Sequence, residues 1–272
     1  MNRRLLPLAA ATLALAFAVS GCSSSSESGT PSEKVADGLT LQEVKDAGVL
    51  TVGTEGTYKP FSYHEGGAGD LTGYDVEVIT AVADKLGVKP EFKETQWDGI
   101  FAGLKAGRFD VIANQVTIDA QRKKAYDFST PYTVSKGVIV TKADNTDISS
   151  FADLKGKTTA QSLTSNWNDL AKKSGAKVEG VEGWAQSITL LKQGRVDATI
   201  NDQLTYLDYQ KSTPDEGIKV AAETKEASEA ALAFPKGSDD LVKAVDSALG
   251  ELQDDGTLAK ISDKYFGEDV SK

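Results

Sequence analysis

Two stretches of the sequence repeat one pattern of residues without a gap. Residues 97–115 and 184–202 each begin with tryptophan, and a leucine, a lysine, a glycine, an arginine, an aspartate and an asparagine then recur at matching positions. Each stretch is typical of a helix that ends at a glycine and leads into a short strand with polar residues at its carboxyl end. Ligands of open α/β sheets bind outside the carboxyl ends of the strands. The repeat therefore favours two lobes that share one cleft, with a chance recurrence of a common helix–glycine–strand arrangement as the alternative.

Apolar runs alternate with amphipathic helical stretches around both copies of the repeat. The pattern predicts strands and helices in turn at 49–53, 75–86, 91–93, 98–105 and 109–113. Further along, it predicts a strand at 157–160 and a helix at 167–173 that Ser165 or Asn166 could cap. The order strand–helix–strand–helix–strand predicts an α/β fold in which helices cover parallel strands.

The first residues have the composition of a secretory signal peptide. Two arginines precede an apolar run from Leu5 to Val19, which is short for a transmembrane helix. The run ends in Val-Ser-Gly-Cys22, which resembles a bacterial lipobox, where the chain is cut before a cysteine that then carries lipid. We expect residues 1–21 to be removed, Cys22 to be lipidated, and residues 22–37 to form a flexible tether. An ordinary signal peptide with an incidental cysteine is the alternative.

The net charge of the chain limits the classes of partner that it can bind. The sequence has 30 Lys and Arg against 40 Asp and Glu, and loss of Arg3 and Arg4 with the signal peptide leaves 28 − 40 = −12. An acidic protein is a poor partner for nucleic acid and for anionic lipid, so the acyl anchor would hold it at the membrane. Cys22 is the only cysteine and His64 the only histidine, so we expect no internal disulfide, metal or cofactor.

Four residues suggest a site for a zwitterion. Arg122 lies near the start of a predicted helix, where a bound carboxylate would explain a cation, although a solvated basic surface at 122–124 is the alternative. Asp202 stands at the equivalent place in the second copy and could bind an ammonium group or simply cap a helix. Tyr58 and Trp97 follow strand ends and could flank a ligand side chain, or pack in the core.

Several segments resemble the family 3 bacterial solute-binding proteins, which serve polar amino acid ABC importers. These segments are 53–61, 73–77, 122–129, 233–238 and 256–267. The resemblance covers residues 38–272 and implies a periplasmic-binding-protein type II clamshell of α/β class. It would have two lobes with a mainly parallel sheet each, joined by two crossing strands. One lobe would contain 38–134 plus 231–272, and the other 135–230.

The resemblance also implies ligand contacts, position by position. Arg122 would bind the α-carboxylate, assisted by Thr117 and by the backbone of Ser165. The α-ammonium would contact Asp202 and the carbonyl of Gln115. The positions that face the ligand side chain would be Glu55, Tyr58, Trp97, Gln161 and Asn201. Relatives that select glutamine tend to have a basic residue where Gln161 stands and a histidine where Asn201 stands, which argues against glutamine here.

A narrower resemblance concerns the ligand. The segments 114–116, 150–157, 160–166 and 198–202 resemble the L-cystine-binding members of the family, and neutral amides suit a long ligand with polar ends. We therefore expect a monomeric, lipid-anchored, extracytoplasmic protein that closes on L-cystine and delivers it to an ABC permease with a cytoplasmic ATPase. The alternatives are glutamine, glutamate or arginine as ligand, a sensor or adhesin, or an arogenate- or prephenate-type dehydratase. The sequence shows no obvious partner for His64, which argues against the dehydratase.

Overall fold

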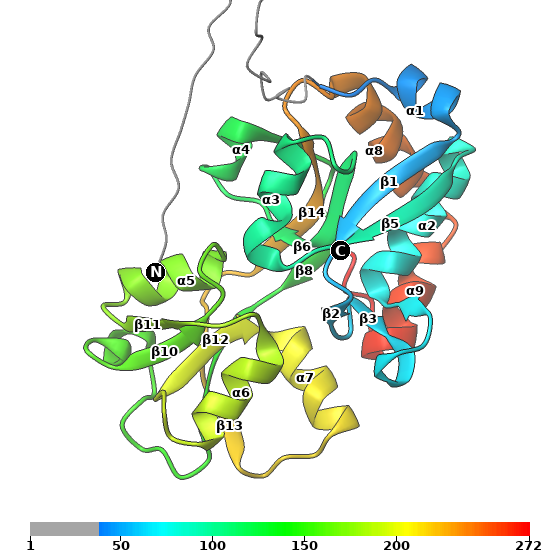
Figure 1. The fold of residues 1–272 in the computed structure, drawn as a ribbon. Coiled ribbons are helices and arrows are strands. Elements are labelled where there is room, and N and C mark those ends of the chain that lie inside the picture. The colour runs from blue at the N-terminus through cyan, green and yellow to red at the C-terminus, as the bar shows by residue number, and fades with distance from the viewer. Residues whose placement is uncertain (1–37) are drawn as a thin grey trace, which may run out of the picture. The chain divides into compact units, whose positions relative to one another are not determined.

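The structure is a computed structural model that describes residues 38–272. The predicted signal peptide, the lipidation at Cys22 and the tether lie outside these residues. Figure 1 shows two groups of helices and strands, each built around its own sheet. Within 38–272, no helix is both long enough and apolar enough to cross a bilayer.

The larger sheet has six strands, and its elements are called the first lobe. Its strand order is β5-β1-β6-β14-β7, with β8 also paired to β14. The strands are β1 (Val49–Thr54), β5 (Lys89–Glu94), β6 (Val111–Thr117), β7 (Tyr126–Phe128), β8 (Thr133–Ser135) and β14 (Ser228–Pro235). The pairs of β1 with β5 and β6 are parallel, and the pairs made by β14 are antiparallel.

Helices cover both faces of this sheet. Successive side chains of a strand point to opposite faces, and β6 has apolar side chains on both. Val111 and Ala113 of β6 belong to the main core with helices α1 (Leu41–Ala47), α2 (Tyr74–Leu86), α8 (Asp239–Asp254) and α9 (Thr257–Phe266). Ile112 and Val116 point to the other face and pack with α3 (Trp97–Lys105). The short α4 (Arg122–Ala125) precedes β7.

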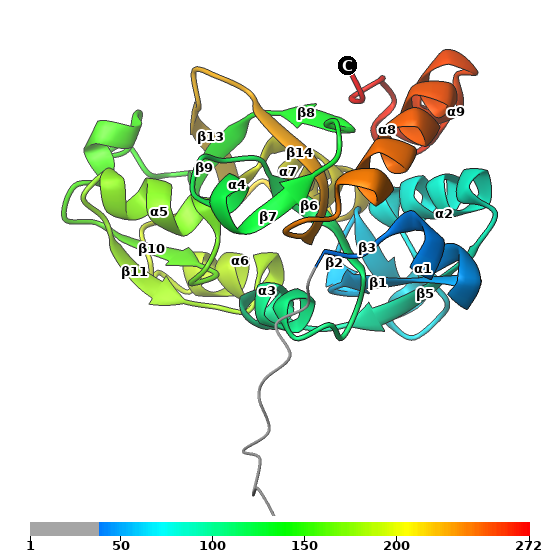
Figure 2. The same cartoon turned by 90° about the horizontal axis from the view of Figure 1, so that it is seen from above.

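The smaller main sheet has five strands, and its elements are called the second lobe. Its order is β11-β10-β12-β9-β13, with parallel pairs around β10 and antiparallel pairs around β9. The strands are β9 (Gly137–Lys142), β10 (Thr158–Gln161), β11 (Lys177–Gly180), β12 (Ala198–Asp202) and β13 (Ile218–Glu223). The helices are α5 (Asn166–Lys173), α6 (Trp184–Lys192) and α7 (Gln203–Ser212), with a 3-10 turn at Phe151–Leu154. Figure 2 shows α5, β10, β11 and β13 on one side of the molecule and α1, α2, α8 and α9 on the other.

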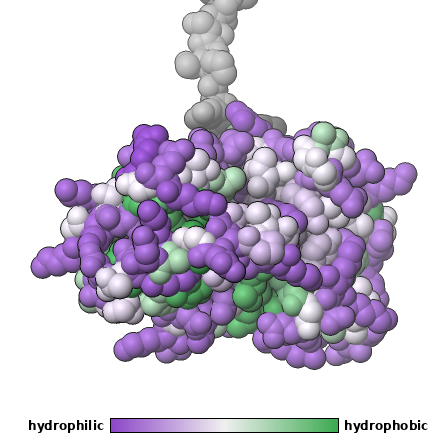
Figure 3. All heavy atoms as spheres, turned by 90° about the horizontal axis from the view of Figure 1, so that it is seen from below, coloured by the Kyte–Doolittle hydropathy of each residue, from purple (hydrophilic) through white to green (hydrophobic). Residues whose placement is uncertain are grey.

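A third sheet is small and belongs to the loop after β1. It consists of β2 (Thr57–Tyr58), β3 (Ser62–His64) and β4 (Leu71–Thr72), with a 3-10 turn at Glu65–Gly67. Much of the surface that Figure 3 shows is polar, with apolar residues visible in a few places, as an acidic chain would present.

The chain passes between the two main sheets twice. It leaves the larger sheet after β8 and enters the smaller one at β9, and it returns between β13 and β14. The predicted lobe boundaries fall inside β8 and β14, and their exact residues stay a prediction. The α/β two-lobed fold class is confirmed, but only three strands of each sheet are joined to one another by parallel pairing. The strands next to the crossings add antiparallel pairs and make both sheets mixed.

Most predicted elements form within a few residues of their expected bounds. Gly87 ends α2 with a φ of 76°, and the Ser165 hydroxyl accepts from the N–H of Asn168 to cap α5. The strand predicted at 109–113 begins only at Val111, because Asp110 instead accepts a hydrogen bond from the N–H of Thr51 at 2.7 Å.

Candidate functional site

A pocket lies where the strand ends of the two lobes meet. The first lobe contributes Glu55, Tyr58, Trp97, Asn114 and Gln115 to its lining, and the second contributes Gln161, Ser165, Glu182, Trp184 and Asn201, among others. Most of the predicted ligand residues therefore line one pocket. Arg122, Thr117 and Asp202 do not line it directly and need separate description.

Arg122 is buried beside the pocket rather than exposed on a basic surface. Its side chain is 10% exposed, while Lys123 and Lys124 of the same helix are exposed. Its guanidinium donates to the carbonyl oxygen of Thr117 at 3.0 Å and to that of Thr164 at 3.5 Å. It thus connects Thr117 of the first lobe to the residue next to Ser165 of the second.

The surroundings of Arg122 would accommodate an anion. Its guanidinium carbon lies 5.4 Å from the ring of Trp97 and 5.1 Å from that of Phe101. Burial lowers the pKa of the guanidinium, which pairs with Asp119 through Nε and Oδ2 at 3.5 Å. Asp119 also accepts from the N–H groups of Gln121 and Arg122 at the start of α4, whereas Thr117 remains in β6.

Asp202 caps a helix, which was the alternative to binding an ammonium group. Its Oδ1 accepts from the N–H of Leu204 at 2.8 Å, which caps α7, and its Oδ2 accepts from the hydroxyl of Ser135. Burial raises the pKa of Asp202 to about 6. The helix cap predicted as the alternative therefore forms, and the role of Asp202 in binding an ammonium group stays a prediction.

Gln115 has a strained backbone that a buried carboxylate holds. Its φ of 49° lies in the left-handed region, which residues other than glycine seldom adopt. Its N–H and its side-chain amide donate to the two oxygens of Asp75 at 2.8 and 2.6 Å, and the hydroxyl of Tyr132 donates to the same carboxylate. Burial raises the pKa of Asp75 to about 7. Asp75 therefore positions Gln115 at the end of β6.

Asn114, the preceding residue, positions Glu55. Its side-chain amide donates to Glu55 Oε2 at 2.7 Å, and its Oδ1 accepts from the N–H of Glu55 at 2.9 Å. Burial raises the pKa of Glu55 to about 7, and the negative charges of Asp98 and Glu182 act in the same direction. The pocket thus contains a carboxylate that a cationic group would stabilise in its ionised form.

Several polar atoms around the pocket are buried without a hydrogen-bond partner among residues 38–272. They are the indole nitrogens of Trp97 and Trp184, Nε2 of Gln161 and Oε1 of Gln115. A buried polar group without a partner loses free energy relative to water, on the order of 1–3 kcal/mol. A polar ligand that reached these atoms would recover that free energy. The same residues 38–272 contain no cluster of His, Cys, Asp and Glu suited to a metal ion.

Direct hydrogen bonds join the two lobes around the pocket. The carboxylate of Asp98 on α3 accepts from the N–H of Leu163 at 3.2 Å and from the N–H and hydroxyl of Thr164 at 2.9 and 2.8 Å. On the other side, the Tyr58 hydroxyl donates to Asn201 Oδ1 at 3.2 Å. Tyr58 therefore bridges the lobes, in addition to lining the pocket as expected.

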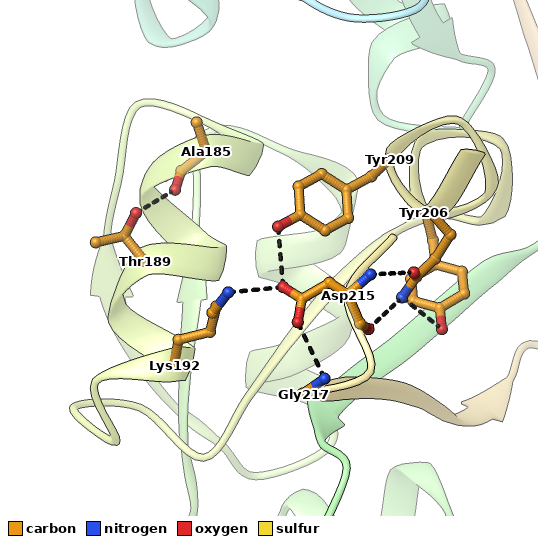
Figure 4. A network of polar contacts seen from close by, with 8 residues as sticks. Ala185, Thr189, Lys192, Tyr206, Tyr209, Asp215 and Gly217 are labelled. Atoms are coloured by element: carbon orange, nitrogen blue, oxygen red, sulfur yellow. Dashed lines mark hydrogen bonds and ion pairs between the residues drawn. The ribbon is translucent and has the colours of Figure 1, made fainter. Parts of the chain in front are cut away.

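A polar network behind Trp184 supports the wall of the second lobe. The rings of Trp184 and Tyr209 meet edge to face at 5.6 Å, and the Tyr209 hydroxyl donates to Asp215 at 3.0 Å. Lys192 and the N–H of Gly217 donate to the same carboxylate at 2.8 and 3.0 Å (Figure 4). The network connects α6, α7 and the loop after α7, so the position of Trp184 depends on all three.

Sequence reasoning missed Trp184, Glu182, Asn114 and Asp98. The repeat contained the signal for Trp184, because Trp184 matches Trp97, which was predicted. Asn114 likewise matches the predicted Asn201. Glu182 precedes the repeat and Asp98 has no acidic counterpart in it, so neither had a comparable signal.

Comparison with known proteins agrees with this geometry. Residues 50–268 match the family described as bacterial extracellular solute-binding proteins, family 3. The chain is 53% identical over 272 residues to the L-cystine-binding protein TcyA of Bacillus subtilis (strain 168), with 100% of each chain covered.

Two solved structures differ in how well they match the arrangement of the lobes. The L-cystine solute receptor of Neisseria gonorrhoeae, in an unliganded open conformation, is 51% identical and covers 85% of this chain and 99% of its own, with a TM-score of 0.58. An ancestral arginine-binding protein bound to arginine is 40% identical and covers 81% and 99%, with a TM-score of 0.75. The less similar sequence has the more similar structure, so the lobes lie closer to the ligand-bound arrangement than to the open one.

Proposed function

Because the chain belongs to family 3 of the bacterial extracellular solute-binding proteins, we propose that it captures L-cystine for an ABC importer. The observation that carries the choice of ligand is the 53% identity with TcyA over the full length of both proteins. Neutral amides at Gln161 and Asn201 support it, because they suit a long ligand without a net side-chain charge.

The proposed binding mode uses the two sides of the pocket differently. Arg122 would bind the α-carboxylate together with Thr117 and the backbone of Ser165. The support is that its buried guanidinium lies between Thr117 and Thr164. Asp202 and the carbonyl of Gln115 would bind the α-ammonium, which would keep Asp202 ionised despite its raised pKa.

Closure of the lobes would complete the site. The loop 161–165 and Asn201 reach the first lobe through Asp98 and Tyr58, so these hydrogen bonds can form only when the lobes are closed. A ligand that contacts both lobes shifts the population toward this form by its differential affinity. The closed, loaded form is the one an ABC permease with its ATPase would recognise.

The protein would be extracytoplasmic and held at the membrane by lipid. Cys22, the signal-like residues 1–21 and the tether at 22–37 support this on sequence grounds. Mass spectrometry of the purified membrane-bound protein should find an acylated N-terminal Cys22. An unmodified Cys22, or retention of residues 1–21, would contradict the anchor.

Tryptophan fluorescence and calorimetry test the ligand. The chain has three tryptophans, and Trp97, Trp167 and Trp184 all line the pocket, so ligand binding should change the emission. We expect L-cystine to bind more tightly than glutamine, glutamate or arginine. Tighter binding of one of these three would refute the choice of cystine, and turnover of arogenate or prephenate would favour the dehydratase.

A further inference from the structure

Gln161 places an unused hydrogen-bond donor deep in the pocket. It is the last residue of β10, it is 3% exposed, and its Nε2 has no partner among residues 38–272. Its carbonyl accepts from the N–H of Val181 at 3.1 Å, so the segment between β11 and α6 runs directly beside it. The backbone of Gln161 therefore lies beside Val181, and Gln161 and residues 182–184 all line the pocket.

The helix α6 begins in this same part of the lining. Its N-cap residue is Gly183, which has a φ of 143° and no side chain to cap the helix. Space is open where a Cβ of Gly183 would lie, and both Gly183 and Trp184 line the pocket. The first N–H groups of a helix lack partners within it and attract anions. The indole nitrogen of Trp184 is also buried without a partner among residues 38–272.

Two carboxylates line the pocket close to these donors, one from each lobe. Glu55 lies at the end of β1, held by Asn114, and Glu182 immediately precedes Gly183. Their charges repel each other, and no ion pair among residues 38–272 includes either one. A cation between them would remove this repulsion.

We propose that these groups form a subsite for a second zwitterionic end of the ligand. Glu55 and Glu182 bind its ammonium, and Gln161 Nε2, the Trp184 indole and the backbone at the start of α6 bind its carboxylate. The matching ligand class is a diamino dicarboxylic acid, with two α-amino-acid ends joined by an uncharged linker. The inference rests on the proposed function, because it requires the first end to occupy the side of Arg122.

Two S-substituted cysteines separate the two halves of this subsite. S-(2-aminoethyl)-L-cysteine carries only the distal ammonium, and S-(2-carboxyethyl)-L-cysteine carries only the distal carboxylate. Calorimetry would compare them and L-cystine on the wild type, Glu182→Gln and Trp184→Phe. The control is Glu179→Gln on β11, an exposed glutamate outside the pocket lining.

The expected result is a crossed pattern. Glu182→Gln should weaken L-cystine and the aminoethyl compound by about 10-fold and leave the carboxyethyl compound unchanged, since it removes a charged partner of the ammonium. Trp184→Phe should weaken L-cystine and the carboxyethyl compound and leave the aminoethyl compound unchanged. Glu179→Gln should change none of the three.

Other outcomes separate the subsite from the function. Equal weakening of both half-ligands by Glu182→Gln would overturn the subsite, since it would indicate a general effect on the pocket. Unchanged L-cystine affinity in both variants would also overturn it, while the proposed function would stand. If the wild type bound none of the three compounds, the proposed function itself would fail, and the subsite with it.

Discussion

Residues 97–115 and 184–202 form the same helix–turn–strand unit in the two lobes. Both helices begin at the tryptophan, and the glycines that follow them, Gly107 and Gly194, have φ values of 66° and 69°. Asp110 accepts from the N–H of Thr51 at 2.7 Å, and Asp197 accepts from that of Thr158 at the same distance. The backbone plan is therefore common to both units.

The side chains at matching positions make different contacts. Trp97 stacks on the cation of Arg122, whereas Trp184 packs against Tyr209. Asp98 bonds to the opposite lobe, and its counterpart Ala185 cannot. A repeated fold thus supplies two similar walls, and side chains that differ at matching positions let only the first unit bond to the opposite lobe through Asp98.

The largest effect should come from Arg122, the cation that packs on Trp97 of the first unit. Arg122→Ala should weaken the ligand about 100-fold or more, because it leaves a buried carboxylate without its partner. Calorimetry with L-cystine measures this, with the exposed Lys124→Ala as control. An affinity close to that of the wild type would show that Arg122 does not bind the ligand and that the two tryptophan walls are more alike than proposed.

Asp98 is the second asymmetry between the units. Asp98→Ala should speed ligand dissociation about 10-fold, because it removes hydrogen bonds that exist only between closed lobes. Asp98→Asn keeps one acceptor oxygen, so its dissociation rate should lie between those of the wild type and Asp98→Ala. Stopped-flow tryptophan fluorescence gives the rates, and the exposed Asp84→Ala on α2 is the matched control. An unchanged dissociation rate in Asp98→Ala would remove its role in holding the lobes together.

The pH dependence of ligand affinity should be set by Glu55, which Asn114 of the first unit holds in place. Asn114 hydrogen-bonds to Glu55, whose pKa burial raises to about 7. Asp98, Glu182 and Tyr58 interact electrostatically with Glu55. The matching Asn201 instead accepts a hydrogen bond from the Tyr58 hydroxyl. An ammonium needs ionised Glu55, so affinity should rise about eightfold from pH 6 to 7.5. Glu55→Gln should flatten this rise, with a remainder below pH 7 from Asp202. An equal slope in both proteins would contradict the assignment.

The stability of the unliganded protein should respond to pH in the opposite sense. A raised pKa means that Glu55 binds more protons in the folded chain than in the unfolded one between pH 4 and 7. Its contribution therefore falls as pH rises through about 7. Thermal unfolding of Glu55→Gln against the wild type across this range isolates the effect.

The smallest effect should be shared by both units. Asp110→Ala removes two hydrogen bonds from Thr51 and Asp197→Ala removes one from Thr158, so each should lower the melting temperature by a few degrees. Ligand affinity should not change, because neither residue lines the pocket. A much larger loss in one variant than in the other would break the equivalence of the two units.

Local patterns accounted for most of the elements and for part of the site. Apolar periodicity and glycine stops located α2, α3 and β1 to within a residue or two, because these signals act over one or two turns of chain. For Arg122 the sequence left two possibilities open, an anion-binding role at a helix start and a solvated basic surface at 122–124, and the structure shows its side chain buried. The left-handed backbone of Gln115 was not anticipated, because Asp75, 40 residues away, holds it.

The sequence by itself determined the α/β class, the two repeated units and the polar residues at their strand ends, because these depend on periodicities within short segments. Only the tertiary structure decided that Asp202 also bonds to Ser135, 67 residues away in the chain, and that Glu182 and Glu55 line the same pocket. It also decided that Asp98 holds the loop of the other lobe. Those contacts join residues on different lobes or far apart in the chain, so they exist only after the crossing strands have set the two sheets against each other.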